Sequence, residues 1–146
     1  MSGTFTQALK AVASRWLNTL HWAAILTPPL VAFNDNVASI QVVAGHSMSP
    51  ALNPNPSSIL LDVVLVSKVS EFSKGDIVLL SEPVREERTR IVKRVADITH
   101  DQSAVYVLGD NSFHSTDSRQ FGYVPSCMVD GVVKSIIFPP WRIRNL

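Results

Sequence analysis

The first candidate for chemistry is a serine in the stretch Ala44-Gly45-His46-Ser47-Met48-Ser49-Pro50. It follows a run of β-forming residues, Ile40 to Val43. Gly45 allows left-handed backbone angles, and Pro50 restricts the residue before it to extended geometry. A serine between such residues is presented to solvent rather than packed, which suits a nucleophile. An ordinary strand-to-turn junction uses the same residue types, so turn chemistry alone is the alternative interpretation.

A lysine in an apolar strand supplies a candidate base. The run Arg90-Ile91-Val92-Lys93-Arg94-Val95 has the pattern of a buried strand with Lys93 inside it. A serine hydroxyl needs a base to take its proton, and a lysine serves when desolvation lowers its pKa. Ser-Lys pairs are a known variant of triad chemistry. The alternative is a structural lysine whose amine reaches water along its own stem.

A third polar stretch completes the pattern, with Gly109-Asp110-Asn111 followed by Ser115-Thr116-Asp117-Ser118-Arg119. In this order the three stretches resemble the type I signal peptidase family. Its pattern is a serine followed by Met and shortly by Pro, then a Lys-Arg pair on a strand, then Gly-Asp-Asn with a downstream Ser-x-Asp-Ser-Arg. The resemblance covers residues 37–140 and implies a β-rich peptidase domain with a Ser-Lys dyad.

Finer features resemble the subunit 2 group of the mitochondrial inner membrane proteases within that family. They are Leu52-Asn53-Pro54, Asp62 to Val66, Phe113-His114-Ser115 and Pro139-Pro140-Trp141-Arg142.

The resemblance implies a role for each matching residue. Ser47 matches the nucleophile, and Ser49 is its rival. Lys93 matches the general base, and Ser115 matches the serine that orients the lysine amine. The backbone N–H of Ser47 is the expected oxyanion donor, because Gly45 occupies the position where many bacterial relatives carry a second donor, a serine hydroxyl.

Supporting and substrate-binding residues follow from the same match. Met48 is expected to seal the floor of the site. Asp110, Asp117 and Arg119 are expected to form one ion-pair cluster that fixes the third stretch, to which Asn111 also belongs. A substrate is expected to bind as an extended strand beside Ile40, Val42 and Val43.

Composition excludes several other classes of function. The chain has 146 residues and a net charge of +1, so no basic nucleic-acid surface is expected. Its single cysteine, Cys127, excludes an internal disulfide. The four histidines lack the spacing of metal ligands, and we expect no cofactor.

The first 35 residues read differently from the rest. Residues 1–34 contain Lys10 and Arg15 and no acid, which is typical of organelle targeting. The uncharged run 16–34 approaches the ~20 residues of a membrane helix, although Pro28-Pro29 should break or kink it. We expect a targeting and membrane-anchor segment at 1–35; the alternative is a helix lying on the bilayer surface or against the domain.

Residues 36–146 carry β signals separated by turns. The expected strands cover residues 37–43, 59–69, 76–80, 89–95, 105–108 and 129–138, with a solvated hairpin tip at 81–88. Short strands of this kind predict an antiparallel barrel or folded sheet.

The resemblance implies a membrane-bound serine endopeptidase that removes sorting presequences from proteins delivered to the mitochondrial intermembrane space. It is expected in the inner membrane, with its domain facing that space and a related subunit as heterodimer partner. The alternatives are a non-catalytic β module that stabilises a partner protease subunit, and a secretory or bacterial type I signal peptidase.

Overall fold

A computed structural model describes residues 2–55, 57–83 and 89–146 of the chain. The chain divides into two compact units, residues 1–35 and residues 36–146. The tip predicted at 81–88 falls largely on residues 84–88, which lie outside the described residues.

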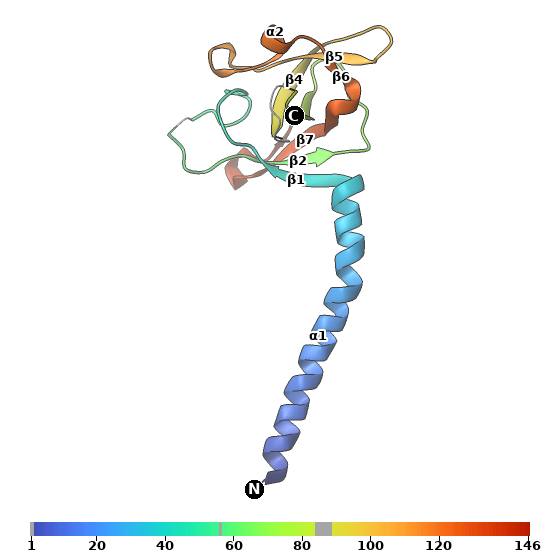
Figure 1. Cartoon of the computed structure of the whole chain (residues 1–146). Coiled ribbons are helices and arrows are strands. Elements are labelled where there is room, and N and C mark those ends of the chain that lie inside the picture. Colours follow the sequence, from blue (N-terminus) through green and yellow to red (C-terminus); the bar gives the residue numbers. More distant parts are fainter. Residues whose placement is uncertain (1, 56, 84–88) are drawn as a thin grey trace. The chain divides into compact units, whose positions relative to one another are not determined.

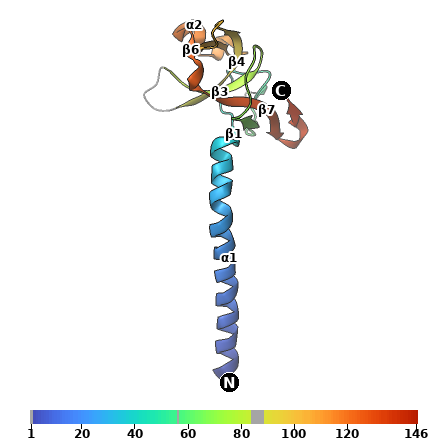
Figure 2. The same cartoon turned by 90° about the vertical axis from the view of Figure 1, so that its right-hand side faces the viewer.

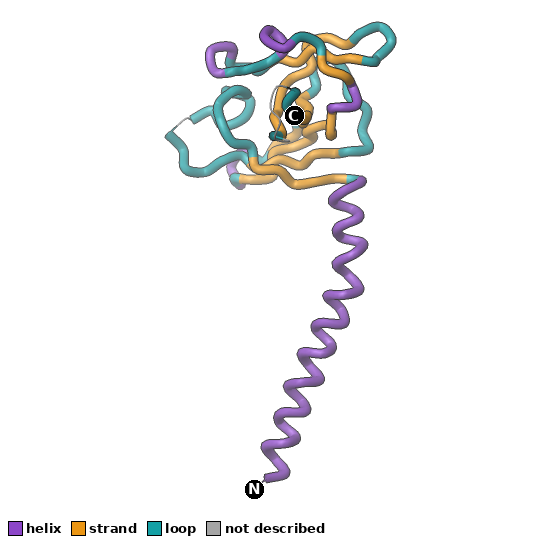
Figure 3. The backbone as a smooth tube through the Cα atoms, viewed as in Figure 1, coloured by secondary structure: helices purple, strands orange, loops and turns teal. Residues whose placement is uncertain are grey.

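Helix α1 spans Ser2–Asn36 and includes both Pro28 and Pro29. Figure 3 shows it as one continuous helix, so of the predicted break or kink at the two prolines the break does not occur. The fixed φ of proline, about −65°, lies in the helical range, so the two rings remove hydrogen-bond donors without forcing the chain out of the helix. Within the described residues, no helix combines the length and the apolar character of a membrane span. The anchor predicted for residues 1–35 is therefore not confirmed.

The second unit is built on one eight-stranded sheet in which every pairing is antiparallel. Its strands are β1 (Ala38–Val42), β2 (Val63–Ser67), β3 (Ile77–Ser81), β4 (Arg90–Ile98), β5 (Ala104–Leu108), β6 (Val124–Pro125), β7 (Val129–Phe138) and β8 (Arg144–Asn145). The spatial order is β1-β2-β7-β3-β4-β5-β6, and β8 pairs with β7. Figure 1 labels β1, β2 and β7 of this sheet. The predicted class, a mainly antiparallel β fold, is confirmed.

Strand β7 lies in the interior of the sheet, between β2 and β3. Figure 2 labels β3 and β7. Successive residues of a strand point to opposite faces. Accordingly, Val133 joins one buried cluster and Val132 joins another. The first cluster contains Val43, Met48, Leu52, Val64, Val66, Ile77, Leu79, Val133 and Ile136. The second contains Val78, Leu80, Val95, Val105, Val107, Val124 and Val132.

The observed strands agree with the predicted ranges except at their ends. Strand β2 begins only at Val63, because residues 59–62 belong to a loop in which Ile59 is almost fully exposed. Strand β4 continues to Ile98 through an irregularity in its pairing with β5. The two-residue strands β6 and β8 were not predicted, since they are too short to show an alternating pattern.

Short helices complete the unit. They are the 3₁₀ turns Ser112–His114, Ser126–Met128 and Pro140–Arg142, and the single-turn helix α2 (Ser118–Phe121).

Candidate active site

Ser47 lies in a turn just beyond the end of β1. Gly45 has φ +87°, the left-handed geometry expected of it. Within the turn, the Ser49 N–H donates to the His46 carbonyl and the Leu52 N–H donates to the Met48 carbonyl. Met48 is 2% exposed and packs in the first buried cluster. A buried anchor directly after Ser47 therefore holds the turn while the serine itself stays half-buried.

Lys93 lies in β4 and is paired across the sheet with Val78, a member of the second buried cluster. The residue is only 3% exposed, so the alternative of an amine that reaches water is wrong. Its Nζ donates to Ser115 Oγ at 2.9 Å. Burial lowers the pKa of the Lys93 amine, while the carboxylates of Asp117 and Glu82 act in the opposite direction. The neutral amine is thus favoured relative to that of an exposed lysine.

Asp117 is hydrogen-bonded to Ser115 and is completely buried. It accepts hydrogen bonds from Ser115 Oγ at 2.8 Å, from the Gly109 N–H at 3.0 Å and from Arg119 Nε at 2.8 Å. Burial alone would raise the pKa of this carboxyl. The bonds from Arg119, Gly109 and Ser115 outweigh burial and hold the pKa well below its usual range. The Lys93 amine is therefore linked through the Ser115 hydroxyl to the Asp117 carboxylate, whose lowered pKa favours the ionised form.

Asp110 does not join this group. Its carboxylate receives two bonds from Arg94, at 2.9 Å from Nε and 2.7 Å from Nη2. Arg94 also donates to the Gly75 carbonyl. The single cluster predicted for Asp110, Asp117 and Arg119 is thus wrong, because Asp117 caps α2 beside Arg119, whereas Asp110 pairs with Arg94 of β4.

Gly109 is the point where the serine turn and the lysine partners meet. A Cβ on this glycine would lie 2.7 Å from the Ser47 carbonyl oxygen and 2.6 Å from Ser115 Cβ, closer than atoms can pack. Beside it, the Asn111 N–H donates to the Ser47 carbonyl at 2.9 Å. The sequence reasoning gave Gly109 no role, although the Gly-Asp-Asn motif at the end of a strand was the available signal.

A cleft of about 160 Å³ lies next to Ser47. Of the predicted substrate-binding residues, Val42 and Val43 line it. Ile40 is not among its lining residues and stands exposed on the same strand. The other residues that line the cleft were not predicted from the sequence. The alternation of side chains within β1 does not indicate which other strands lie opposite it. The residues that those strands contribute are Leu79, Arg90, Ile91 and Val92.

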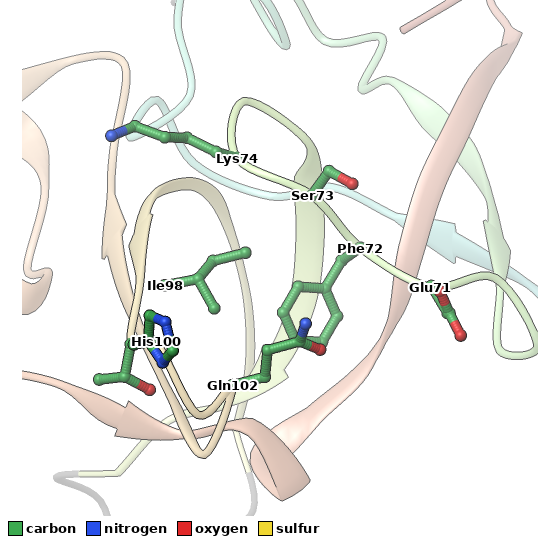
Figure 4. A pocket seen from close by; sticks show the side chains of 8 residues that line it. Glu71, Phe72, Ser73, Lys74, Ile98, His100 and Gln102 are labelled. Carbon is green, nitrogen blue, oxygen red and sulfur yellow. The ribbon is translucent and has the colours of Figure 1, made fainter.

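A larger hollow, of about 460 Å³, lies elsewhere on the domain (Figure 4). Phe72 and Ile98 form its apolar part, and both pack against the second buried cluster. Neither Ser47 nor Lys93 lines it. Over the part of the chain that the structure describes, no three histidine, cysteine or acidic side chains are arranged to hold a metal ion.

Comparison with known proteins agrees with this geometry. Residues 97–138 match the family model described as signal peptidase, peptidase S26. The chain is 32% identical to mitochondrial inner membrane protease subunit 2 of Saccharomyces cerevisiae, over 89% of this chain and 85% of that protein. It is 35% identical to the subunit 2 protein of Mus musculus, over 84% and 79%. Subunit 1 of Schizosaccharomyces pombe is 28% identical, over 73% and 78%.

The family model covers the third polar stretch, and the two subunit 2 proteins are similar over more than four fifths of the chain. The chain therefore belongs to the S26 signal peptidase family, together with the subunit 2 proteins of the mitochondrial inner membrane protease.

Proposed function

We propose that this protein is a serine endopeptidase with Ser47 as nucleophile and Lys93 as general base. One observation carries the proposal: the amine of the buried Lys93 donates to Ser115. The side chain of Ser115 and the backbone carbonyl of Ser47 both lie against Gly109. A non-catalytic β module would gain nothing from burying an amine, because desolvating it costs free energy.

In the proposed reaction the neutral Lys93 amine takes the proton from Ser47 Oγ as that oxygen attacks the scissile carbonyl carbon. The negative charge that develops on the carbonyl oxygen is met by the Ser47 N–H. The Lys93 ammonium then gives its proton to the departing amine, leaving an acyl-enzyme. Water attacks the ester, again with Lys93 as base, and Ser47 is released.

Substrate binding is proposed along β1. Among the described strands, β1 stands at the end of the sheet and pairs with β2 alone, so its other edge can accept an extended peptide. The cleft beside Val42 and Val43 measures about 160 Å³, a size that fits a small side chain before the cleaved bond. The exposed Ile40 would lie farther along the bound peptide.

The proposed setting follows the relatives. They are named mitochondrial inner membrane protease subunits 1 and 2. We infer the same membrane for this chain, with residues 1–35 as targeting and anchoring segment, residues 36–146 facing the intermembrane space, and a related subunit as heterodimer partner. The substrates are then proteins whose sorting presequences are removed on delivery to that space.

The test compares two serines of one turn. Ser47→Ala should lower cleavage of a presequence peptide by about 10³-fold or more, because no other nucleophile replaces the hydroxyl. Ser49→Ala is the matched control and should keep turnover within about tenfold of the wild type. Both variants should unfold at the wild-type urea concentration. Equal loss in the two variants would reject Ser47 as the nucleophile.

A further inference from the structure

The side chain of Asn53 holds the backbone that leads into the serine turn. Its Nδ2 donates to the Val43 carbonyl at 2.6 Å and to the Gly45 carbonyl at 3.1 Å. Asn53 is 5% exposed and has φ +47°, a left-handed geometry that asparagine tolerates better than most residues. One buried amide therefore fixes both the cleft residue Val43 and the glycine two positions before Ser47.

Asp62 holds Asn53 in turn. The Asn53 N–H donates to Asp62 Oδ2 at 2.8 Å, and the Asp62 N–H donates to Asn53 Oδ1 at 2.8 Å. The Asp62 carbonyl also accepts from the Val43 N–H at 2.9 Å. Since Asp62 is 2% exposed, its carboxylate requires a counter-charge inside the protein.

Arg142 supplies that counter-charge from a distant part of the chain. Its Nη2 lies 3.1 Å from Asp62 Oδ2 and 3.1 Å from the carbonyl oxygen of Ala51, which is 91 residues away in sequence. Arg144 adds a second bond to the same carbonyl at 3.0 Å. The C-terminal turn is thereby tied to the loop that carries Ser47.

We propose that Arg142 is a positioning residue for the nucleophile, acting through Asp62 and Asn53 to set the backbone between Val43 and Ser47. The inference rests on the proposed role of Ser47. It joins three motifs that lie far apart in the sequence: Leu52-Asn53-Pro54, Asp62 to Val66, and Pro139-Pro140-Trp141-Arg142. Among the residues that the structure describes, no hydrogen bond joins Arg142, Asp62 or Asn53 to Lys93, Ser115 or Asp117.

The kinetic test uses Arg142→Met, which keeps much of the bulk and loses the charge. At a temperature where the variant is folded, its kcat should fall about 10- to 100-fold, because the serine is misplaced relative to the base. The midpoint of its pH–rate curve should stay at the wild-type value, because the surroundings of Lys93 are unchanged. Arg142→Lys restores the charge and should recover a large part of the lost kcat.

The matched control is Lys74→Met, which removes a cation from an exposed pair with Asp97. It should leave kcat within about twofold of the wild type. If kcat per folded molecule of Arg142→Met also stays within that limit while only stability falls, Arg142 is a structural residue and the proposal is overturned. A shifted pH midpoint would overturn it as well, since Arg142 would then act on the base.

A second measurement does not depend on which serine attacks. Hydrogen exchange of the full-length Arg142→Met protein should be faster at the amides of Val43, Leu52 and Asn53, and unchanged at Gly109, whose N–H bonds to Asp117. Uniform acceleration, or none, would contradict the proposed path. If Ser47→Ala remained active while this pattern was seen, the proposed nucleophile would fail and the positioning of the turn would stand.

Discussion

Lys93 is held by side chains, whereas Ser47 is held by its backbone. The lysine amine bonds to the Ser115 hydroxyl, which bonds to the Asp117 carboxylate, which is paired with Arg119. The serine turn is instead held by hydrogen bonds to its backbone carbonyls. Asn53 donates to carbonyls before the serine, and the Asn111 N–H donates to the carbonyl of Ser47 itself.

The two arrangements also differ in how they are encoded. The hydrogen-bonded chain from Lys93 runs through one short stretch, residues 115–119, and the charges of Asp117, Glu82 and Arg119 act on the lysine amine. The partners of the serine turn come from distant parts of the chain and act through geometry. Substitutions near the lysine should therefore move the pH dependence of cleavage, and substitutions near the serine should change its rate at every pH.

The largest effect is expected when the lysine is removed. Lys93→Met should lower kcat by about 10⁴-fold, because the proposed general base is lost. Its free energy of unfolding should not fall, because methionine carries no amine to desolvate. In the wild type, the folded-state pKa of Lys93 lies below its unfolded value. The contribution of Lys93 to stability should thus be present at high pH, be lost as pH falls through the folded pKa, and be absent in the methionine variant.

Lys93→Arg serves as its control in urea titrations and cleavage assays. Arginine keeps a charge that it cannot release, so this variant should be both inactive and less stable than the methionine variant. Cleavage by Lys93→Arg near the wild-type rate would mean that Lys93 is structural.

An intermediate effect is expected at the glycine between the two sides. Gly109→Ala places a methyl group against the Ser47 carbonyl and the Ser115 side chain, so it should lower kcat by about 100-fold and stability by about 1–3 kcal/mol. Gly45→Ala is the matched variant, since its methyl group meets no atom within 4 Å and only the φ of +87° is unfavourable. It should cost about 1 kcal/mol. A larger loss of kcat in Gly45→Ala than in Gly109→Ala would show that the two sides do not meet at Gly109.

The smallest effect on rate, but a diagnostic one, is expected from Asp117→Asn. The Asp117 charge raises the pKa of Lys93 against the effect of burial. Removing this charge should lower that pKa, so the pH–rate curve should rise at lower pH than in the wild type, with kcat at its plateau reduced less than about tenfold. Glu71→Gln, an exposed carboxylate elsewhere, should not move the curve. A midpoint that moves upward would contradict the assigned electrostatics.

The sequence was enough to predict features that depend only on neighbouring residues, such as strand ranges and glycine turns. The range predicted for β7, residues 129–138, is the observed one, and Gly45 has the predicted left-handed geometry. The partner of Asp110 was predicted wrongly, because it depends on the register that brings Arg94 beside it. The far wall of the cleft, including Leu79, depends on how the sheet folds over the serine turn. Such long-range geometry leaves no periodic trace in the sequence.

The central place of β7 has a consequence for the order in which the molecule matures. Among the described strands that precede it, β1 and β2 form one group and β3 to β6 another, and β7 is the strand that pairs with both. The serine turn and the lysine strand come earlier in the chain than β7, and Arg142 follows it. A nascent or truncated chain lacking residues beyond 128 therefore holds both reactive groups in halves that no strand connects. On the proposed mechanism, cleavage should therefore require β7 and Arg142 as well as the two reactive side chains.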